Sequence, residues 1–489
     1  MLPQFLWAIV VSFLLADDYR LSFDTPVTVT GKNFSTTSAP ALFSLPSSSS
    51  EVTISLALCA AASTNPPRVF VSNSSDSQVV PGPNGGADVF GVQIGGLGLG
   101  NFTLGLSSES TAGVLAVYGG APSDSLEIGV TQGTTPLHAP VQDLPFFGDS
   151  TANEVLLFSP PFLPPEPAPQ PTFPNYMLPQ ANISLPSASP SQNSPNFTLF
   201  LAPLSAGLSA LPQTACAIRA GVMNNTQAAQ SAKVLAEQLW LRDELGWRKE
   251  WLVGLLTPLT NYSVYAIQDG TRLGGPIYFT TKSASFSCQL VHALPYCPTT
   301  AYAVPLPAPP ARALAYDSSN LPTSLTAPLF GYLTNFTTSL LTTACGRDAY
   351  SPLQSCADCQ AAYRRWLCSI SLPRCGEFPQ TPSDPQQQQQ QTLAVPAPAL
   401  VPQMSGMTPR NAALGNASNY TALLPCIETC NAVDRACPVF LGFRCPLPQF
   451  TAYASYGVGY IDSADGQVKD GGVPGVPQDQ WGNVFCNVS

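Results

Sequence analysis

The sequence has few charged residues and very few histidines. Charged side chains make up 10% of its 489 residues, well below the roughly 25% of an ordinary soluble domain. The two histidines, His138 and His292, exclude any site built from several imidazoles. A net charge of −10 argues against nucleic-acid binding, which requires clustered lysine and arginine. The 45% hydrophobic content is nevertheless high enough to build real cores.

The sequence also lacks the motifs of catalysis and ion binding. No Gly-x-Ser-x-Gly, His-Glu-x-x-His or phosphate-loop pattern occurs. The segment 462–466 resembles a fragment of a calcium loop, but Ile461 falls where the first oxygen ligand is required. We therefore predict that the protein is not an enzyme and has no catalytic residues, no bound metal and no cofactor.

Long apolar runs are scarce as well. The run Leu2–Leu15 is followed by Ala16 and is shorter than the ~20 residues that span a bilayer. It predicts a signal peptide over residues 1–16, with an uncleaved anchor as the alternative. We expect the rest of the chain to pass through the secretory pathway to the extracellular face of the plasma membrane, with the endoplasmic reticulum as the alternative location.

Two features that are abundant agree with the secretory route. Asn-x-Ser/Thr acceptors predict N-linked glycans, and they occur at Asn33, Asn73, Asn101, Asn182, Asn196, Asn224, Asn261, Asn335, Asn416, Asn419 and Asn487. The fourteen cysteines form an even set, which fits seven disulfides in an oxidising compartment.

Most cysteines lie in the last part of the chain. Twelve are expected to form disulfides among themselves: Cys288, Cys297, Cys345, Cys356, Cys359, Cys368, Cys375, Cys426, Cys430, Cys437, Cys445 and Cys486. Sequence alone does not give their connectivity. Cys59 and Cys216 are left over, and we hypothesise that they pair and join two β modules. Because neither histidine is near Cys356 and Cys359, a structural role is favoured for them over a zinc or redox site.

Two β modules are predicted in the first part of the chain. Short β-favouring runs between Gly, Ser, Asn and Pro clusters predict a β-sandwich over 17–148. The proline-rich stretch 149–195 is interpreted as a linker. Residues 196–284 resemble a fibronectin type III domain, since Tyr262 is placed for a tyrosine corner whose hydroxyl bonds upstream backbone. An Ala-rich pattern predicts a helical insertion over Thr226–Leu245, with Gly246 as its stop.

The third domain, 285–489, is predicted to be cysteine-rich and mainly helical. Apolar residues at helical spacing predict helices over Leu325–Thr343 and Cys356–Cys368. The stretch 376–411 contains prolines and six consecutive glutamines, and is interpreted as a disordered insertion.

A fixed order of cysteines and aromatic residues in this domain is specific in combination. The stretches include Tyr296-Cys297-Pro298, Ser355-Cys356-Ala357-Asp358-Cys359, Trp366-Leu367-Cys368, Pro373-Arg374-Cys375, Cys437-Pro438 and Ser455-Tyr456-Gly457. On these residues the region from Asn261 to Cys486 resembles the fungal stretch-activated calcium-channel component family, the regulatory subunit of the yeast high-affinity calcium influx system.

The resemblance implies a non-pore regulatory subunit of a plasma-membrane calcium channel. Such a subunit assembles with a four-repeat, voltage-gated-type pore subunit and supports calcium influx in response to stretch or stress. The resemblance also implies a Frizzled-like fold for the cysteine-rich domain. The alternative is a secreted or cell-surface adhesion or ligand-binding glycoprotein without a channel role.

The contact with the pore subunit is expected on the cysteine-rich domain. Arg364, Arg365 and Arg374 are the predicted partner-binding residues, because arginine and aromatic side chains are enriched at binding hot spots. A solvated helix face is the alternative for Arg364 and Arg365. Among the aromatic side chains of the same helix, Trp366 could contact the partner or, as the alternative, lie in the protein core.

Heavy N-glycosylation is the first testable prediction. Endoglycosidase treatment of the protein from its secretory pathway is expected to lower its apparent mass by much more than one glycan, because eleven acceptors follow an apolar leader. Gel electrophoresis before and after treatment measures the change. An unchanged band would contradict the assignment to this compartment.

Overall fold

A computed structural model describes most of the chain. The described residues are 20–31, 40–48, 50–60, 66–73, 80–86, 88–104, 113–165, 177–181, 194–224, 232–310, 313–343, 345, 350–378, 398–404, 406–407, 410–414, 419–447, 450, 452–458 and 484–488. The predicted signal peptide, the glutamine run and the segment 462–466 lie outside them. The chain divides into two compact units. One comprises 1–144, 195–230 and 263–276, and the other comprises 145–194, 231–262 and 277–489.

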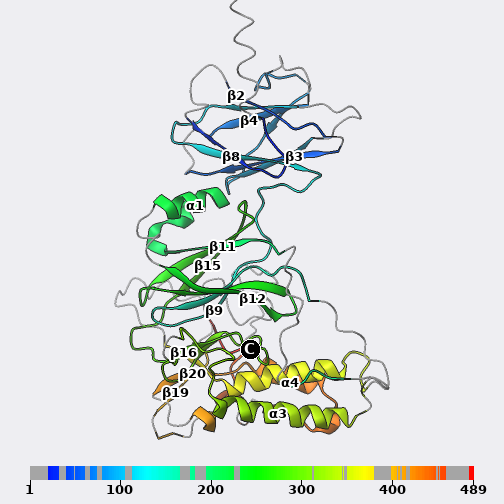
Figure 1. Ribbon diagram of the computed structural model, residues 1–489, viewed down its shortest axis with the longest axis vertical. Coiled ribbons are helices and arrows are strands. Elements are labelled where there is room, and N and C mark those ends of the chain that lie inside the picture. Colours follow the sequence, from blue (N-terminus) through cyan, green and yellow to red (C-terminus); the bar gives the residue numbers. More distant parts are fainter. Residues whose placement is uncertain are drawn as a thin grey trace, which may run out of the picture. The chain divides into compact units, whose positions relative to one another are not determined.

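The first eight strands form two four-stranded antiparallel sheets around one apolar core. Their orders are β1-β8-β3-β6 and β2-β7-β4-β5, and Figure 1 shows β3 and β8 in one layer and β2 and β4 in the other. The strands are β1 Val27–Thr30, β2 Ala41–Ser44, β3 Val52–Leu58, β4 Arg68–Ser72, β5 Val89–Val92, β6 Leu99–Leu104, β7 Val114–Tyr118 and β8 Ser125–Gln132.

Strand β3 shows how the sequence pattern builds this core. Its large apolar residues Val52, Ile54, Leu56 and Leu58 alternate with small or polar ones, so they point to one face and enter the shared core. The other face is buried too, and Thr53 donates a hydrogen bond of 2.6 Å to the carbonyl of Gly133. Strand β3 lies in the interior of its sheet, between β8 and β6.

Seven further strands form two more antiparallel sheets. Their orders are β12-β13-β10-β9 and β11-β14-β15. The strands are β9 Phe146–Ser150, β10 Val155–Phe158, β11 Phe197–Pro203, β12 Lys233–Asp243, β13 Gly246–Gly254, β14 Asn261–Gln268 and β15 Arg272–Thr280. The rings of Phe147 in β9 and Phe279 in β15 stack with centroids 5.1 Å apart, which brings an edge of one sheet against the other. Helix α1, Ala215–Asn224, packs on β11 and β14 in one apolar cluster.

The linker predicted over 149–195 starts too early, because the first residues of that range form strands. Strand β9 extends to Ser150 and strand β10 covers Val155–Phe158, so both fall within residues 149–195. Strand β10 pairs with β13, with Leu156 opposite Leu252. The stretch 149–158 therefore belongs to the sheet β12-β13-β10-β9 and not to a linker. Its backbone pairs with neighbouring strands, and its apolar side chains are buried.

The helix predicted over Thr226–Leu245 is wrong for residues 232–245, and residues 226–231 lie outside the described chain. Residues Lys233–Asp243 form strand β12, which pairs antiparallel with β13 through a turn at 244–245. Gly246 marks that turn and not a helix end: its φ is +134°, and a Cβ there would lie 2.6 Å from the carbonyl oxygen of Phe162. Cross-strand pairing with a buried partner strand overrides the helical propensity of the Ala-rich stretch.

The tyrosine corner predicted at Tyr262 is confirmed. Its side chain is completely buried, and its hydroxyl accepts a hydrogen bond of 2.9 Å from the backbone N–H of Thr257. The ring also stacks on Phe279, with centroids 5.5 Å apart. This contact fixes the chain at the point where it enters β14.

The last part of the chain is richer in helices, and two of the predicted ones are confirmed. The helices are α3 Thr323–Leu341, α4 Cys356–Ser371, α6 Ile427–Ala436 and α7 Ala452–Ser455. Figure 1 shows α3 and α4 running side by side. Two small sheets accompany them, β16-β17 and β18-β20-β19, with β16 Gln289–Val291, β17 Tyr302–Val304, β18 Arg374–Gly376, β19 Leu400–Gln403 and β20 Tyr420–Leu423.

The interpretation of 376–411 as a disordered insertion is wrong at both ends. Gly376 ends β18, and strand β19 pairs with β20, with Val401 opposite Ala422. Asn411 donates a hydrogen bond of 2.6 Å from its side-chain amide to the carbonyl of Ser371. Residues 379–397, which include the glutamines, lie outside the described chain.

Replacing Tyr262 with phenylalanine tests the tyrosine corner. We expect Tyr262→Phe to lower the free energy of unfolding by about 1 kcal/mol, because the ring stays and only the hydrogen bond is lost. Thermal unfolding followed by circular dichroism measures the change. Tyr332→Phe, at an exposed position of α3, is the matched control and should leave the midpoint unchanged. Equal midpoints for Tyr262→Phe and the parent protein would contradict the role of this bond.

Candidate functional site

Helix α4 is bonded by disulfides to three different segments. Cys356 pairs with Cys345, Cys359 with Cys437 and Cys368 with Cys297. The other bonds of the cysteine-rich region are Cys288–Cys375, Cys426–Cys486 and Cys430–Cys445. Cys59 and Cys216, the two cysteines that parity leaves over, are bonded to each other within the unit that contains the N-terminal sheets. No cysteine of the chain is free.

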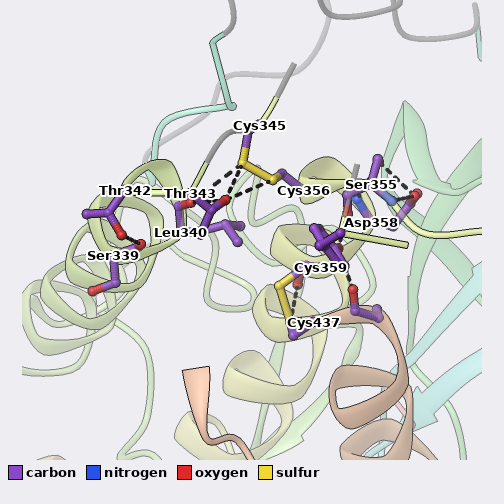
Figure 2. Close-up of a disulfide and its surroundings, with 12 residues drawn as sticks. Ser339, Leu340, Thr342, Thr343, Cys345, Ser355, Cys356, Asp358, Cys359 and Cys437 are labelled. Carbon is purple, nitrogen blue, oxygen red and sulfur yellow. Dashed lines mark hydrogen bonds between the residues drawn. A yellow bond between two sulfur atoms is a disulfide. The ribbon is translucent and has the colours of Figure 1, made fainter. Parts of the chain in front are cut away.

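The start of α4 is fixed by a capping box beside two of these disulfides. The Ser355 hydroxyl accepts from the backbone N–H of Asp358, and the Asp358 carboxylate accepts from the backbone N–H of Ser355 at 2.7 Å. These two hydrogen bonds satisfy two backbone N–H groups that have no partner within the helix. The negative carboxylate also interacts favourably with the positive end of the helix dipole. Figure 2 shows the cap next to Cys345–Cys356 and Cys359–Cys437. The orientation of α4 is therefore set both covalently and by its cap.

Aromatic side chains join α3, α4 and the segment after α6. The rings of Phe336 and Tyr363 stack with centroids 3.6 Å apart, and Phe443 meets Trp366 edge-on at 4.9 Å. The indole N–H of Trp366 donates to the hydroxyl of Tyr456 at 2.9 Å. Tyr363 and Trp366 are half-buried and packed, so they hold the helices together. For Trp366 the structure agrees with a place in the core.

Arg364 is not available to a partner. Its side chain is buried, and its guanidinium donates to the backbone carbonyls of Gln180 and Ala181 at 2.9 Å and of Tyr296 at 3.3 Å. Burial lowers the pKa of the Arg364 guanidinium to about 10, which still leaves it charged at neutral pH. The prediction of a partner contact here is wrong, and so is its alternative of a solvated face.

Arg374 is also inside the protein. Its Nε lies 2.8 Å from Oδ2 of Asp149, and its Nη2 donates to the carbonyl of Gly148 at 2.8 Å. Asp149, which is 1% exposed, also accepts from the backbone N–H of Ala303 at 3.2 Å. This ion pair joins β9 to β17 and β18, so the partner contact predicted at Arg374 is wrong as well. Arg365 is exposed, and a partner contact there stays a proposal.

The sequence around Arg364 and Arg374 does not indicate that either side chain is buried. Arg374 lies in a three-residue strand beside the bonded Cys375, and Asp149 lies in β9 just after the buried Phe147. An isolated carboxylate within an apolar strand is the one hint that the sequence offers, because such a group is buried only with a partner.

The predicted glycosylation acceptors differ in their exposure to solvent. Among the described acceptors, the exposed ones are Asn101, Asn196, Asn224, Asn261, Asn335 and Asn419, and Asn73 is half-buried. Asn33, Asn182 and Asn416 lie outside the described residues. Asn487 is completely buried, and its backbone N–H donates to the carbonyl of Leu424. A glycan does not fit there in the folded protein, so the prediction at Asn487 is wrong.

Large apolar side chains are exposed between Cys437 and Val458. Each of them is between 54% and 86% exposed, and they are Val439, Phe440, Leu447, Phe450, Tyr453 and Val458. We call these six residues the apolar segment. Cys359–Cys437 and Cys430–Cys445 hold its first part on α4 and α6. Where such side chains form a contiguous patch, they mark a surface that a partner covers.

Both histidines have carboxylate partners. His138 is buried in the N-terminal unit, where its Nδ1 lies 3.0 Å from Oγ of Ser55 and its Nε2 lies 3.2 Å from Oε2 of Glu127. All three residues are buried, so this Ser-His-Glu group joins β3 and β8 within the fold and is closed to a substrate. His292 pairs with Glu250 at 2.5 Å beside a cavity of about 510 Å³.

No helix in the described part of the chain is long and apolar enough to cross a membrane.

The fold consists of several small antiparallel sheets followed by a disulfide-rich and more helical region, and its seven disulfides are consistent with the secretory pathway. Residues 52–471 match the family Mid1, described as "Stretch-activated Ca2+-permeable channel component". The chain belongs to this family, which is a family of channel components and not of enzymes.

Fungal relatives show the same relationship. "Stretch-activated cation channel MID1" of Cryptococcus neoformans is 35% identical over 430 residues, which are 80% of this chain and 68% of that protein. "Stretch-activated cation channel yam8" of Schizosaccharomyces pombe is 28% identical over 48% of this chain and 45% of that protein. "Stretch-activated cation channel MID1" of Saccharomyces cerevisiae is 30% identical over 40% of this chain and 33% of that protein. The chain thus spans less than half the length of the last two relatives.

Breaking the Arg374–Asp149 pair tests its place in the structure. We expect Arg374→Gln to lower the free energy of unfolding by about 3–5 kcal/mol, because it leaves a buried carboxylate without its cation. Denaturant unfolding of the purified protein measures the loss. Adding Asp149→Asn should recover part of it, since the double variant buries no unpaired charge. Arg435→Gln, at an exposed position of α6, is the control for charge removal. Equal losses for the two single Arg variants would contradict the assignment.

Proposed function

We propose that the chain is a non-pore regulatory subunit of a plasma-membrane calcium channel. It supports stretch- or stress-activated calcium influx by assembling with a four-repeat, voltage-gated-type pore subunit at the extracellular face. Membership of a family of channel components supports an association with a channel. The exposed apolar segment supports a docking surface on the cysteine-rich region, and it is the observation on which the proposal rests.

The apolar segment has the properties of a preorganised docking surface. Phe440, Phe450 and Tyr453 supply large aromatic groups, which dominate binding at protein interfaces. Disulfides from Cys437 and Cys445 tie its first part to α4 and α6, so little conformational entropy is lost on binding. Arg365 and Arg444 are exposed cations of the same region and would add polar contacts at the rim.

Glycan positions narrow the choice of surface. Asn335 is exposed on α3, whose neighbouring residues Tyr332 and Thr338 are exposed too. A glycan at Asn335 would cover this face of α3 and prevent a close protein contact. The docking surface is therefore proposed on the apolar segment and not on the outer face of α3.

The domain organisation is proposed in finer terms. The orders β9-β10-β13-β12 and β11-β14-β15 correspond to the ABED and CFG sheets of immunoglobulin-type sandwiches, with the tyrosine corner at the start of the sixth strand. We therefore assign Phe146–Thr280 to a module of the immunoglobulin or fibronectin type III kind. It follows an N-terminal β-sandwich, and a Frizzled-like cysteine-rich domain follows it.

One observation favours the alternative of an adhesion or ligand-binding role. A cavity of about 440 Å³ in the N-terminal unit is lined by Pro67, Phe70, Gly96 and Leu211, with Arg68 at its wall. An aromatic and a cation beside exposed backbone suit a small polar ligand. This reading predicts a monomeric protein with no channel attached.

Mutation of the apolar segment tests the channel assignment. We expect Phe440→Ser with Tyr453→Ser to lower co-purification of the pore subunit at least about tenfold, since hot-spot side chains contribute about 2 kcal/mol each. Affinity purification of the tagged protein from solubilised membranes, followed by mass spectrometry, measures the partner. Leu97→Ser with Met223→Ser removes exposed apolar groups from the N-terminal unit and is the matched control.

Two outcomes would contradict the proposal. If the parent protein brings down no four-repeat channel and migrates as a monomer in blue-native electrophoresis, the adhesion reading is favoured. If the channel is recovered equally with the double variant and its control, docking does not use the apolar segment. These point variants are preferable to removing Cys288–Ser489, because that deletion also strips Asp149 of its ion pair.

A further inference from the structure

A short piece of the proline-rich connection is bound to the cysteine-rich region. Residues Met177–Ala181, called the strap below, lie between β10 and β11 in sequence and contact α4. Leu178 is 7% exposed, although Met177 next to it is 82% exposed. Leu178 belongs to one apolar cluster with Leu340 of α3, Cys359 of α4 and Val433 of α6. The strap therefore inserts one leucine between three helices.

Two side chains of α4 hold the backbone of the strap. The side-chain amide of Gln360 donates to the carbonyl of Pro179 at 2.7 Å and to the hydroxyl of Thr337 in α3 at 2.8 Å. Arg364, one turn further along α4, donates to the carbonyls of Gln180 and Ala181. Three consecutive carbonyls of the strap are thus bound by groups that face the same way on one helix.

The contacts of this site are those expected for a bound extended peptide. Its donors contact main-chain oxygens of the strap, Leu178 is buried, and Ala181 packs against a neighbouring apolar cluster. Pro179 fixes φ and has no N–H to satisfy, which favours an extended backbone at this point of the strap. Main-chain contacts with a single apolar anchor are the usual chemistry of peptide grooves.

We propose that α3 and α4 form a peptide clamp and that the strap is its releasable ligand. Unlike the segments bonded to α4 by disulfides, the strap is held by non-covalent contacts alone. Gln360 and Arg364 are buried in the structure, where the strap is bound. The clamp thus has two states: the bound one of the structure, and a released one in which residues 177–181 leave α4. This inference rests on the proposed function: release sets how readily stretch activates calcium influx.

Hydroxyl-radical labelling distinguishes the two states. Leu178 is protected only while the strap is bound, and the exposed Met177 beside it is the internal reference. We expect the labelling of Leu178 relative to Met177 to rise at least about threefold in Gln360→Ala and in Arg364→Gln, because each loses donors to the strap. Arg435→Gln, which removes an exposed cation of α6, should leave the ratio unchanged. Thiol labelling of the unreduced proteins checks that all disulfides are formed.

Calcium uptake after hypo-osmotic shock is the second measurement, made in cells that lack their own copy of the protein. With equal surface amounts and equal co-purification of the pore subunit, we expect Gln360→Ala to shift the shock needed for half-maximal uptake by at least about twofold. An unchanged labelling ratio in Gln360→Ala and Arg364→Gln would overturn the clamp. A raised ratio with unchanged uptake would overturn its regulatory role. Failure of the parent protein to bring down the channel would overturn the proposed function and leave the labelling result standing.

Discussion

The three disulfides of α4 are the constraint on which the cysteine-rich region depends. The bonds from Cys359 and Cys368 close loops of 78 and 71 residues, whereas the bond from Cys356 closes one of 11. Long closures remove most entropy from the unfolded chain, so the first two contribute most to stability. The short bond instead fixes the chain just before the helix, next to the capping box of Ser355. One helix thus carries both the long-range and the local restraints.

A chain with so few charges uses several of them internally. Arg364 binds carbonyls, Arg374 binds Asp149, and Arg242 lies 4.1 Å from the centroid of the Phe146 ring. Burial lowers the pKa of Arg242 to about 10, as it does for Arg364. A buried guanidinium is tolerated because its planar set of five donors can be satisfied by oxygens in several directions. The arginines of this region therefore act as structural links between elements that are distant in sequence.

Sequence reasoning succeeded where one local pattern decides the structure. The apolar spacing of α3, the alternation of Val52–Leu58 and the position of Tyr262 each specify their element without knowledge of the rest. It failed for β12, where the partner strand β13 decides between helix and strand. It failed for Arg364 and Arg374 because exposure depends on segments about 180 and 225 positions away, and no periodicity records such contacts.

The contacts of the second unit argue against a flexible hinge at residue 284. Asp149 reaches Arg374, the carboxylate of Glu377 accepts from the backbone N–H of Ser283 at 2.9 Å, and the indole of Trp240 donates to the carbonyl of Pro298 at 2.8 Å. Two of these bonds start from the sheet β12-β13-β10-β9, and the third starts from Ser283, just after β15. All three reach the cysteine-rich region and lie within one compact unit. Any force that reaches this sheet is therefore transmitted to β17 and β18 through directional bonds. A disulfide joins Cys375, within β18, to Cys288 just before β16. Another joins Cys297, which precedes β17, to Cys368 of α4. The strap also contacts α4, through the non-covalent bonds of Gln360 and Arg364. Helix α4 is therefore linked both to the segment that precedes β17, through a disulfide, and to the strap.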